Sequence, residues 1–218
     1  MDPPAPSLAD VLDRAALVLC RHGAFARRRA ENGRVSEGLT ETGRREAEAL
    51  AAVLAGAPRP LVLYASPQPR AVATAEVLAR HLELPVHTDE DLAELRLGLG
   101  AAVPRERSAV LWELARAAPD VPPLAGAESL AALQLRALAT LRGARLAHPG
   151  RIVVAVTHGG LLEAVHAGIA GRPLASLGGA RLEIASGACS AWAEVDGALE
   201  ELARNVPPSP AGRQGRGL

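Results

Sequence analysis

Two histidines and two arginines stand where short apolar runs of this sequence end. Arg21 and His22 directly follow the first run, Arg70 comes shortly after the second, and His158 closes a third. A neutral imidazole is a nucleophile that can accept a phosphoryl group, and a protonated one can stabilise the oxygens of the group in transfer. Arginine presents planar pairs of donors that match phosphate oxygens. These residue types together predict phosphoryl-transfer chemistry.

The apolar runs have the pattern of buried strands. They read "ALVLC", "LVLYAS" and "RIVVAVTH", at residues 16–20, 61–66 and 151–158. Ligands of open α/β sheets bind beyond the carboxyl ends of the strands, so we expect the four side chains to meet at one rim of the sheet. Each of them alone has an ordinary interpretation, as a turn residue or a solvated arginine. Their joint placement at strand ends favours a site.

Helical patterns alternate with these strands. Four segments carry apolar residues at helical spacing, namely 40–56, 69–82, 128–142 and 160–171. Segment 180–202 instead alternates and breaks at glycines, as antiparallel strands joined by turns do. This order predicts an α/β fold, a three-layer α/β/α sandwich with a mostly parallel central sheet.

The ends of the chain differ in composition from its middle. We expect a partly disordered N-terminal extension over residues 1–14 and a disordered tail, rich in Pro, Gly and Arg, over 205–218. Residues 15–204 form a single predicted domain. Within it, the proline-containing region 98–127 is expected to be an inserted helix and loop that caps one edge of the sheet.

Composition excludes several function classes. The 218 residues hold 24 basic and 24 acidic side chains, a balance that argues against nucleic-acid or membrane-surface partners. Every basic residue is arginine, which excludes Schiff-base chemistry and a phosphate-loop lysine. Cys20 and Cys189 are interpreted as buried small residues of a reducing compartment. With neither a signal peptide nor an apolar span, a cytoplasmic protein is expected.

A phosphoryl transfer also needs a proton donor for the leaving oxygen. The segment "TDEDLAELRLG" (88–98) offers four acidic residues, and Glu94 is one of them. The residue types alone leave all four open. The remaining histidines, His81, His87, His148 and His166, are interpreted as surface residues, and no metal site is predicted.

The same stretches resemble the histidine phosphatase superfamily, also called phosphoglycerate mutase-like proteins. The resemblance covers about residues 16–195 and rests on motifs in the family's order and spacing. These are "LVLCRHG", "GLTETGRREAEALA", "YASPQPRAVATAEVLA", "DLAELRLG" and "VVAVTHGGLLEAV".

The resemblance implies a role for each matching residue. His22 would become the phosphohistidine, Arg21, Arg70 and His158 would hold the phosphoryl group, and Glu94 would act as general acid and then as base. It also implies that the protein uses no metal and no other cofactor. Gly159, at the start of a predicted helix, would add a backbone N–H donor to the phosphate.

Departures from the family concentrate after Gly23. Ala24 and Phe25 replace the family's usual acidic or amide residue and small residue, and "AFARRRAENGRVSEG" (24–38) is shorter than the equivalent loop of the mutases. Within this loop Asn32 corresponds to an Asn of the family, and Phe25 is expected to line the pocket. Its run of arginines, Arg27, Arg28, Arg29 and Arg34, is interpreted mainly as a solvated charged loop.

Three functions are compatible with these residues. The favoured one is a metal-independent phosphoric monoester hydrolase that acts on a phosphorylated small metabolite or sugar through a phosphohistidine. A phosphoglycerate mutase-type isomerase is the second, although it must protect its intermediate from water, which the short loop disfavours. A repurposed phospholigand-binding protein is the third. The sequence leaves the oligomeric state open, a dimer being one option.

Overall fold

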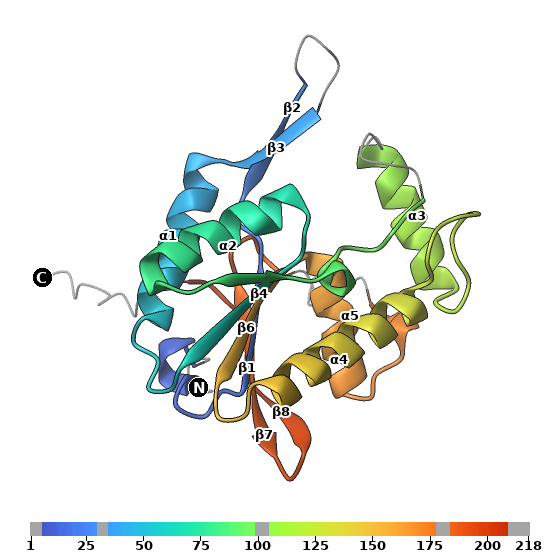
Figure 1. Cartoon of the computed structure of the whole chain (residues 1–218). Coiled ribbons are helices and arrows are strands. Elements are labelled where there is room, and N and C mark those ends of the chain that lie inside the picture. The colour runs from blue at the N-terminus through green and yellow to red at the C-terminus, as the bar shows by residue number, and fades with distance from the viewer. Residues whose placement is uncertain (1–5, 30–34, 99–104, 178–183, 209–218) are drawn as a thin grey trace, which may run out of the picture.

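A six-stranded sheet runs through the centre of the computed structural model, which describes residues 6–29, 35–98, 105–177 and 184–208 (Figure 1). Its strands, in spatial order, are β5 (Val86–Thr88), β4 (Leu61–Ala65), β6 (Ile152–Thr157), β1 (Leu17–Arg21), β7 (Cys189–Val195) and β8 (Ala198–Val206). The first four are parallel, whereas β7 is antiparallel to β1 and β8 to β7. The carboxyl ends of β4, β6 and β1 therefore share one edge.

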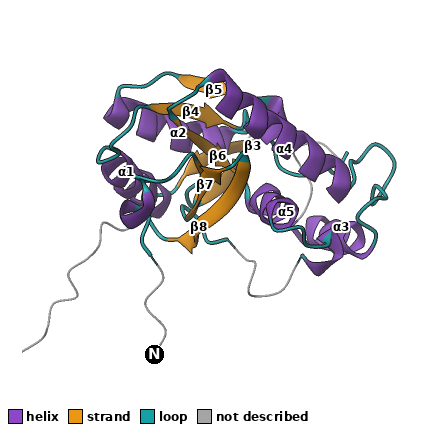
Figure 2. Ribbon diagram, turned by 90° about the horizontal axis from the view of Figure 1, so that it is seen from below, coloured by secondary structure: helices purple, strands orange, loops and turns teal. Residues whose placement is uncertain are grey.

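Helices cover both faces of the sheet (Figure 2). On one side lie α1 (Glu41–Leu54) and α2 (Pro69–Leu82); on the other lie α4 (Leu130–Ala147) and α5 (Gly159–Ile169), with α3 (Arg105–Ala117) further out. Short 3-10 turns, η1 (Ala9–Val11), η2 (Glu90–Leu92) and η3 (Leu174–Ser176), complete the described elements. The three-layer α/β/α architecture with a mostly parallel sheet is thus confirmed.

Successive side chains of the central strand β1 pack alternately into the two halves of the core. Val18 and Cys20 of β1 belong to the apolar cluster with α1 and α2, while Leu17 and Leu19 belong to the cluster with α4 and α5. Successive side chains of a strand point to opposite faces, so a strand covered by helices on both sides must be apolar at every position. This explains why β1 reads as an uninterrupted apolar run.

Residues 24–38, treated as a loop in the sequence, contain a β-hairpin. Its strands β2 (Phe25–Arg29) and β3 (Val35–Leu39) form a separate two-stranded sheet that projects from the end of the molecule where β1 finishes (Figure 1). The hairpin is polar, so it lacks the apolar alternation that marks a strand packed on a core. A cross-strand ion pair from Arg27 Nε to Glu37 Oε1, 2.7 Å long, joins its two strands.

Both ends of the predicted domain carry ordered residues beyond the boundaries placed at 15 and 204. Leu8, Val11 and Leu12, around η1, are buried in the core. Strand β8 continues to Val206. In the part of the chain that the structure describes, no helix has the length and apolar character needed to cross a membrane.

His166 corrects an expectation, because it is buried and not at the surface. Its Nδ1 lies 2.8 Å from Glu201 Oε2 and its Nε2 2.9 Å from Ser190 Oγ. These partners come from β7 and β8, so nothing near His166 in the sequence signals them. The two cysteines behave as predicted: Cys20 and Cys189 are buried free thiols that face each other across β1 and β7.

Candidate active site

His22 lies just past the end of β1 and is almost completely buried. Its backbone N–H donates to Thr157 O of the neighbouring strand β6 (2.9 Å), so the main chain of the sheet fixes its position. Its ring Nδ1 lies 3.0 Å from Gly23 O, a contact in which Nδ1 carries the proton and donates. The lone pair of the neutral ring is then on Nε2, and this is the atom available as a nucleophile.

The environment of His22 keeps its ring uncharged. Burial lowers the pKa of His22 to about 4, and the charges of Arg70 and Arg21 act in the same direction, although the hydrogen bond to Gly23 O opposes them. A histidine with this pKa is neutral at pH 7. The ring is therefore in the protonation state that nucleophilic attack requires.

Arg70, in the first turn of α2, is directed at the nucleophile. Its Nε donates to His22 Nε2 (3.0 Å) and its Nη1 to Glu37 Oε2 (2.9 Å). Glu37 also pairs with Arg27, and the two guanidinium groups hold the pKa of Glu37 below its usual value despite burial. The guanidinium of Arg70 lies 5.0 Å from the centroid of the Phe25 ring. The hairpin thus orients the arginine that faces His22.

His158 supplies a second imidazole beside the first. The two ring centroids are 5.2 Å apart, and His158 Nε2 lies 2.8 Å from Ser66 Oγ, which follows strand β4. Burial, together with the nearby positive charge of Arg70, lowers the pKa of His158 well below its usual range. The convergence of β1, β4 and β6 expected from the sequence therefore exists as a contact among side chains.

Two buried nitrogen atoms of this site lack a hydrogen-bond partner within the described residues. They are Arg21 Nε and His158 Nδ1. Arg21 is held by a hydrogen bond from its Nη1 to Ile184 O, so its Nε–H is left over. Buried polar groups are normally paired, and leaving one unpaired costs about 1–3 kcal/mol. An anion bound beside His22 would satisfy these groups.

Glu94 lies on the segment after η2, across from α5. Its Oε2 accepts from Gly160 N (3.1 Å) and its Oε1 from Leu95 N (3.0 Å), so both oxygens of the carboxyl are oriented by backbone donors. Gly160 follows His158 by two residues, so this bond places the carboxyl at the start of α5, whose N-cap is His158. A Cβ at position 160 would come within 2.0 Å of Trp112 and 2.7 Å of Glu94 Oε1. The glycine is needed for this close approach.

The predicted site residues that the structure describes come together. His22, Arg21, Arg70, His158 and Glu94 all lie at the carboxyl edge of the sheet, and Phe25 packs edge-on against the His22 ring with 5.1 Å between centroids. Gly159 begins α5, and a Cβ there would lie 3.4 Å from Arg21 Nε. Asn32 lies outside the described residues, so its predicted role stays a prediction.

Several residues of the site were missed in the sequence. Glu37, Ser66 and Thr74 hydrogen-bond to the predicted set, and Thr74 accepts from Gly23 N (3.1 Å) and donates to Arg70 O (2.8 Å). Trp112 lies close to Gly160, where an added Cβ would meet its ring. Ser66 and Thr74 lie in the same motif as Arg70, "YASPQPRAVATAEVLA", so their nearness to Arg70 in the sequence could have identified them as site residues. No sequence pattern marks Glu37 or Trp112 as part of the site. Among the residues the structure describes, no three His, Cys, Asp or Glu side chains group in a way that could hold a metal ion.

Sequence comparison identifies relatives of the chain. The model of the histidine phosphatase superfamily (branch 1) matches residues 17–204. Phosphoglycerate mutase-like protein 4 of Arabidopsis thaliana is 32% identical over 163 residues, 71% of each chain. A metal-independent phosphoserine phosphatase of the same plant is 30% identical over 161 residues, 69% of this chain and 66% of the relative.

Solved structures share the fold over most of its length. A mycobacterial glucosyl-3-phosphoglycerate phosphatase in complex with inorganic phosphate superposes with a TM-score of 0.68 at 26% identity, covering 88% of this chain and 97% of that one. The YhfR protein of Bacillus stearothermophilus superposes with a TM-score of 0.73 at 24% identity, covering 87% and 96%. The fold predicted from the sequence is therefore shared with phosphoglycerate mutase-like proteins.

Proposed function

The chain belongs to the histidine phosphatase superfamily, and on that premise we propose that it is a metal-independent phosphatase that hydrolyses a small phosphomonoester through a phosphohistidine on His22. The observation that carries the proposal is the pair of unpartnered buried nitrogens, Arg21 Nε and His158 Nδ1, beside a neutral nucleophile. Buried donors without a partner, next to Arg70, are suited to a phosphate group.

In the first step, His22 Nε2 attacks phosphorus and the bond from phosphorus to the leaving oxygen breaks. Arg21 and Arg70 as positive groups, and His158 as a neutral hydrogen-bond donor through Nδ1–H, stabilise the three oxygens of the phosphoryl group in transfer. Glu94, in its acid form, gives its proton to the departing oxygen, and the product is an alcohol. His22 then carries the phosphoryl group.

In the second step, Glu94 acts as a base. It takes a proton from water, the water oxygen attacks phosphorus, and the bond from phosphorus to His22 Nε2 breaks. Inorganic phosphate leaves, and both Glu94 and His22 return to their starting protonation states. The two backbone bonds to the carboxyl keep it in place through both steps.

Hydrolysis of p-nitrophenyl phosphate, with and without a chelator, tests the proposal. His22→Ala should lose turnover entirely, Glu94→Gln should retain a fraction of it, and His81→Ala should match the native protein, because His81 is an exposed residue of α2. Rapid quenching with ³²P-labelled substrate should trap label on the native protein and none on His22→Ala. Turnover that survives in His22→Ala, or that the chelator abolishes, would overturn the proposal.

The substrate is sought among small phosphorylated acids and sugars. The names of similar proteins include a phosphoserine phosphatase and a glucosyl-3-phosphoglycerate phosphatase, so a screen begins with phosphoserine, phosphoglycerates and sugar phosphates. Adding 3-phosphoglycerate with a bisphosphate primer separates the alternatives. Release of inorganic phosphate supports the phosphatase, whereas isomerisation would identify a mutase, and binding without labelling of His22 a phospholigand-binding protein.

A further inference from the structure

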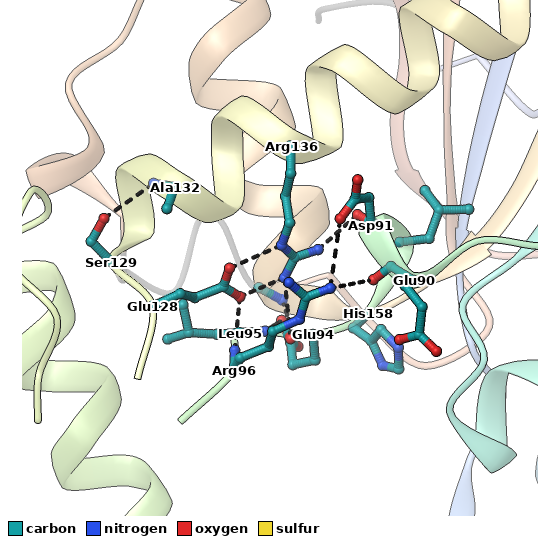
Figure 3. A network of polar contacts seen from close by, with 12 residues as sticks. Glu90, Asp91, Glu94, Leu95, Arg96, Glu128, Ser129, Ala132, Arg136 and His158 are labelled. Carbon is teal, nitrogen blue, oxygen red and sulfur yellow. Dashed lines mark hydrogen bonds and ion pairs between the residues drawn. The ribbon is translucent and has the colours of Figure 1, made fainter. Parts of the chain in front are cut away.

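A nearly buried ion pair lies beside the chain segment that carries Glu94 (Figure 3). Arg136 of α4 and Glu128, just before that helix, expose 10% and 12% of their side chains. Arg136 Nη2 lies 2.5 Å from Glu128 Oε1, and Nε lies 2.9 Å from Oε2, so the pair is bidentate. A buried ion pair is by itself weak evidence of stabilisation, because removing two charges from water is costly.

The rest of this pair's hydrogen-bonding capacity is directed at the backbone around Glu94. Arg136 Nη1 donates to Asp91 O (2.7 Å) and Nη2 to Glu94 O (3.3 Å). Glu128 Oε1 accepts from Arg96 N (2.8 Å), and Glu128 N donates to Arg96 O (2.8 Å). The segment is thus fixed before, at and after Glu94.

The segment needs such support because it is not part of a regular element. Residues 93–98 follow η2 and form neither helix nor strand, so no ladder of backbone hydrogen bonds defines the path of the chain at Glu94. Helix α4 packs against α5, which begins beside His158, and also contacts η2. A side chain from α4 that binds this segment therefore fixes the position of the segment relative to α5. Figure 3 shows Arg136 reaching from the helix to the segment between Asp91 and Arg96.

We infer that Glu128 and Arg136 are positioning residues that hold the carboxyl of Glu94 at the leaving oxygen of the substrate. Within the described residues, neither side chain hydrogen-bonds to His22, Arg21 or Arg70, so the direct contacts of the pair go to the Glu94 segment. The charge of Arg136 also helps to lower the pKa of His158, a smaller effect than burial of that ring. This inference rests on the proposed role of Glu94 as the general acid. A displacement of about 1 Å in a reacting group can cost about 100-fold in rate.

The dependence of the rate on the leaving group tests this role. A nitrophenolate leaves without a proton, whereas the alkoxide of an alkyl phosphate needs one. Arg136→Met should therefore lower kcat/KM for β-glycerophosphate by about 100-fold and for p-nitrophenyl phosphate by less than about 5-fold. Glu94→Gln should show the same selectivity. A partly unfolded protein would lose both activities in equal proportion.

Three further variants support the test. The double variant Glu128→Gln with Arg136→Met leaves no buried charge unpaired and should show the same selective loss. Arg145→Met removes another ion pair of α4, to Glu194 on β7, and should leave the ratio of the two activities unchanged. In the Glu94→Gln background, Arg136→Met should add little further selectivity, because the two changes act on one group.

A measurement independent of turnover separates failure of this inference from failure of the proposed function. Amide hydrogen exchange at Gly160 and Leu95, the two donors to the Glu94 carboxyl, should quicken in Arg136→Met and not in Arg145→Met. Unchanged exchange at both amides, or an equal loss of both activities, would overturn the positioning role. If exchange at these amides is faster in Arg136→Met but the native protein hydrolyses no phosphomonoester, the proposed phosphatase activity is wrong, whereas the inference that Arg136 positions Glu94 stands.

Discussion

His22 is the residue whose protonation controls the proposed first step. Burial, aided by the charges of Arg70 and Arg21, lowers its pKa to about 4, so the ring should stay neutral from pH 8 down to about pH 5. In ¹⁵N-histidine-labelled protein, the His22 signals, assigned with His22→Asn, should therefore not shift over this range. A titration near the ordinary histidine value of about 6.5 would contradict the effect of burial.

A titration of activity complements that measurement. The acid limb of kcat/KM reports groups of the free enzyme and of the free substrate. With His22 neutral, a limb near pH 6 belongs to the second ionisation of the phosphomonoester, about 6 for such groups. Loss of activity due to His22 itself is expected only as the pH approaches about 4.

Gly160 is a residue whose missing side chain matters. A Cβ there would overlap the Trp112 ring and approach Glu94 Oε1, both of which lie on the acid side of the site. Gly160→Ala should lower kcat/KM for an alkyl phosphate by about 10- to 100-fold, since the carboxyl must move. Gly143→Ala, in α4 with no atom within 4 Å of the added Cβ, is the control and should retain full activity.

At the scale of elements, Thr40 connects helix α1 to the site. Its Oγ1 accepts from Gly43 N (3.1 Å) as the N-cap and donates to Ala24 O (3.1 Å), two residues after His22. Thr40→Ala should reduce the free energy of unfolding by about 1 kcal/mol, measured by urea denaturation. Thr40→Ser keeps the hydroxyl and should lose much less, and an equal loss in both variants would show that the hydroxyl is not responsible.

The sequence predicted the long elements that pack on the core but missed short ones, such as η1 with its buried Val11 and β5 with Val86 packed on the core, as well as the hairpin. The strands β1, β4 and β6 are covered on both faces, so each is a recognisable apolar run, and α2 was predicted with its observed bounds. The hairpin strands β2 and β3 carry mostly polar residues, and of these strands only Leu39, at the end of β3, packs against a described core cluster, so periodicity could not detect them.

Site residues could be predicted from the sequence where a side chain suited to phosphoryl transfer stands directly after a predicted strand. Arg21, His22 and His158 could be chosen from their places after apolar runs, whereas Glu94 stood among four acidic residues and was chosen by the resemblance alone. The contacts that single it out come from Gly160 and Arg136, which lie 66 and 42 positions away in the chain. Long-range contacts of this kind leave no local pattern in one sequence.

At the scale of the whole molecule, buried histidines link stability to pH. The pKa values of His22, His158 and His166 are lowered by folding, so below about pH 6.5 the unfolded chain binds protons that the native protein excludes. The free energy of unfolding should therefore fall as the pH drops from 6.5 towards 4. Each such histidine contributes a slope of up to about 1.4 kcal/mol per pH unit.

Urea denaturation at pH 7, 6 and 5 measures this dependence. His22→Asn should show a shallower slope, because one proton-binding site of the unfolded chain is gone. The exposed His81 provides the control, and His81→Gln should keep the native slope. A free energy of unfolding that is constant from pH 7 to 5 would contradict the linkage.

The nucleophile His22 and the acid Glu94 lie on parts of the fold that differ in how well backbone hydrogen bonds protect them from local unfolding. Strand β1 is hydrogen-bonded on both edges, to β6 and β7, whereas Glu94 lies on an irregular segment secured by a few side-chain contacts. Segments with few backbone bonds open at lower free energy than central strands. Mild denaturant should then release the acid while His22 keeps its place. The protein would still take a phosphoryl group from an activated ester but would pass it to water only slowly, so the phosphohistidine on His22 would accumulate.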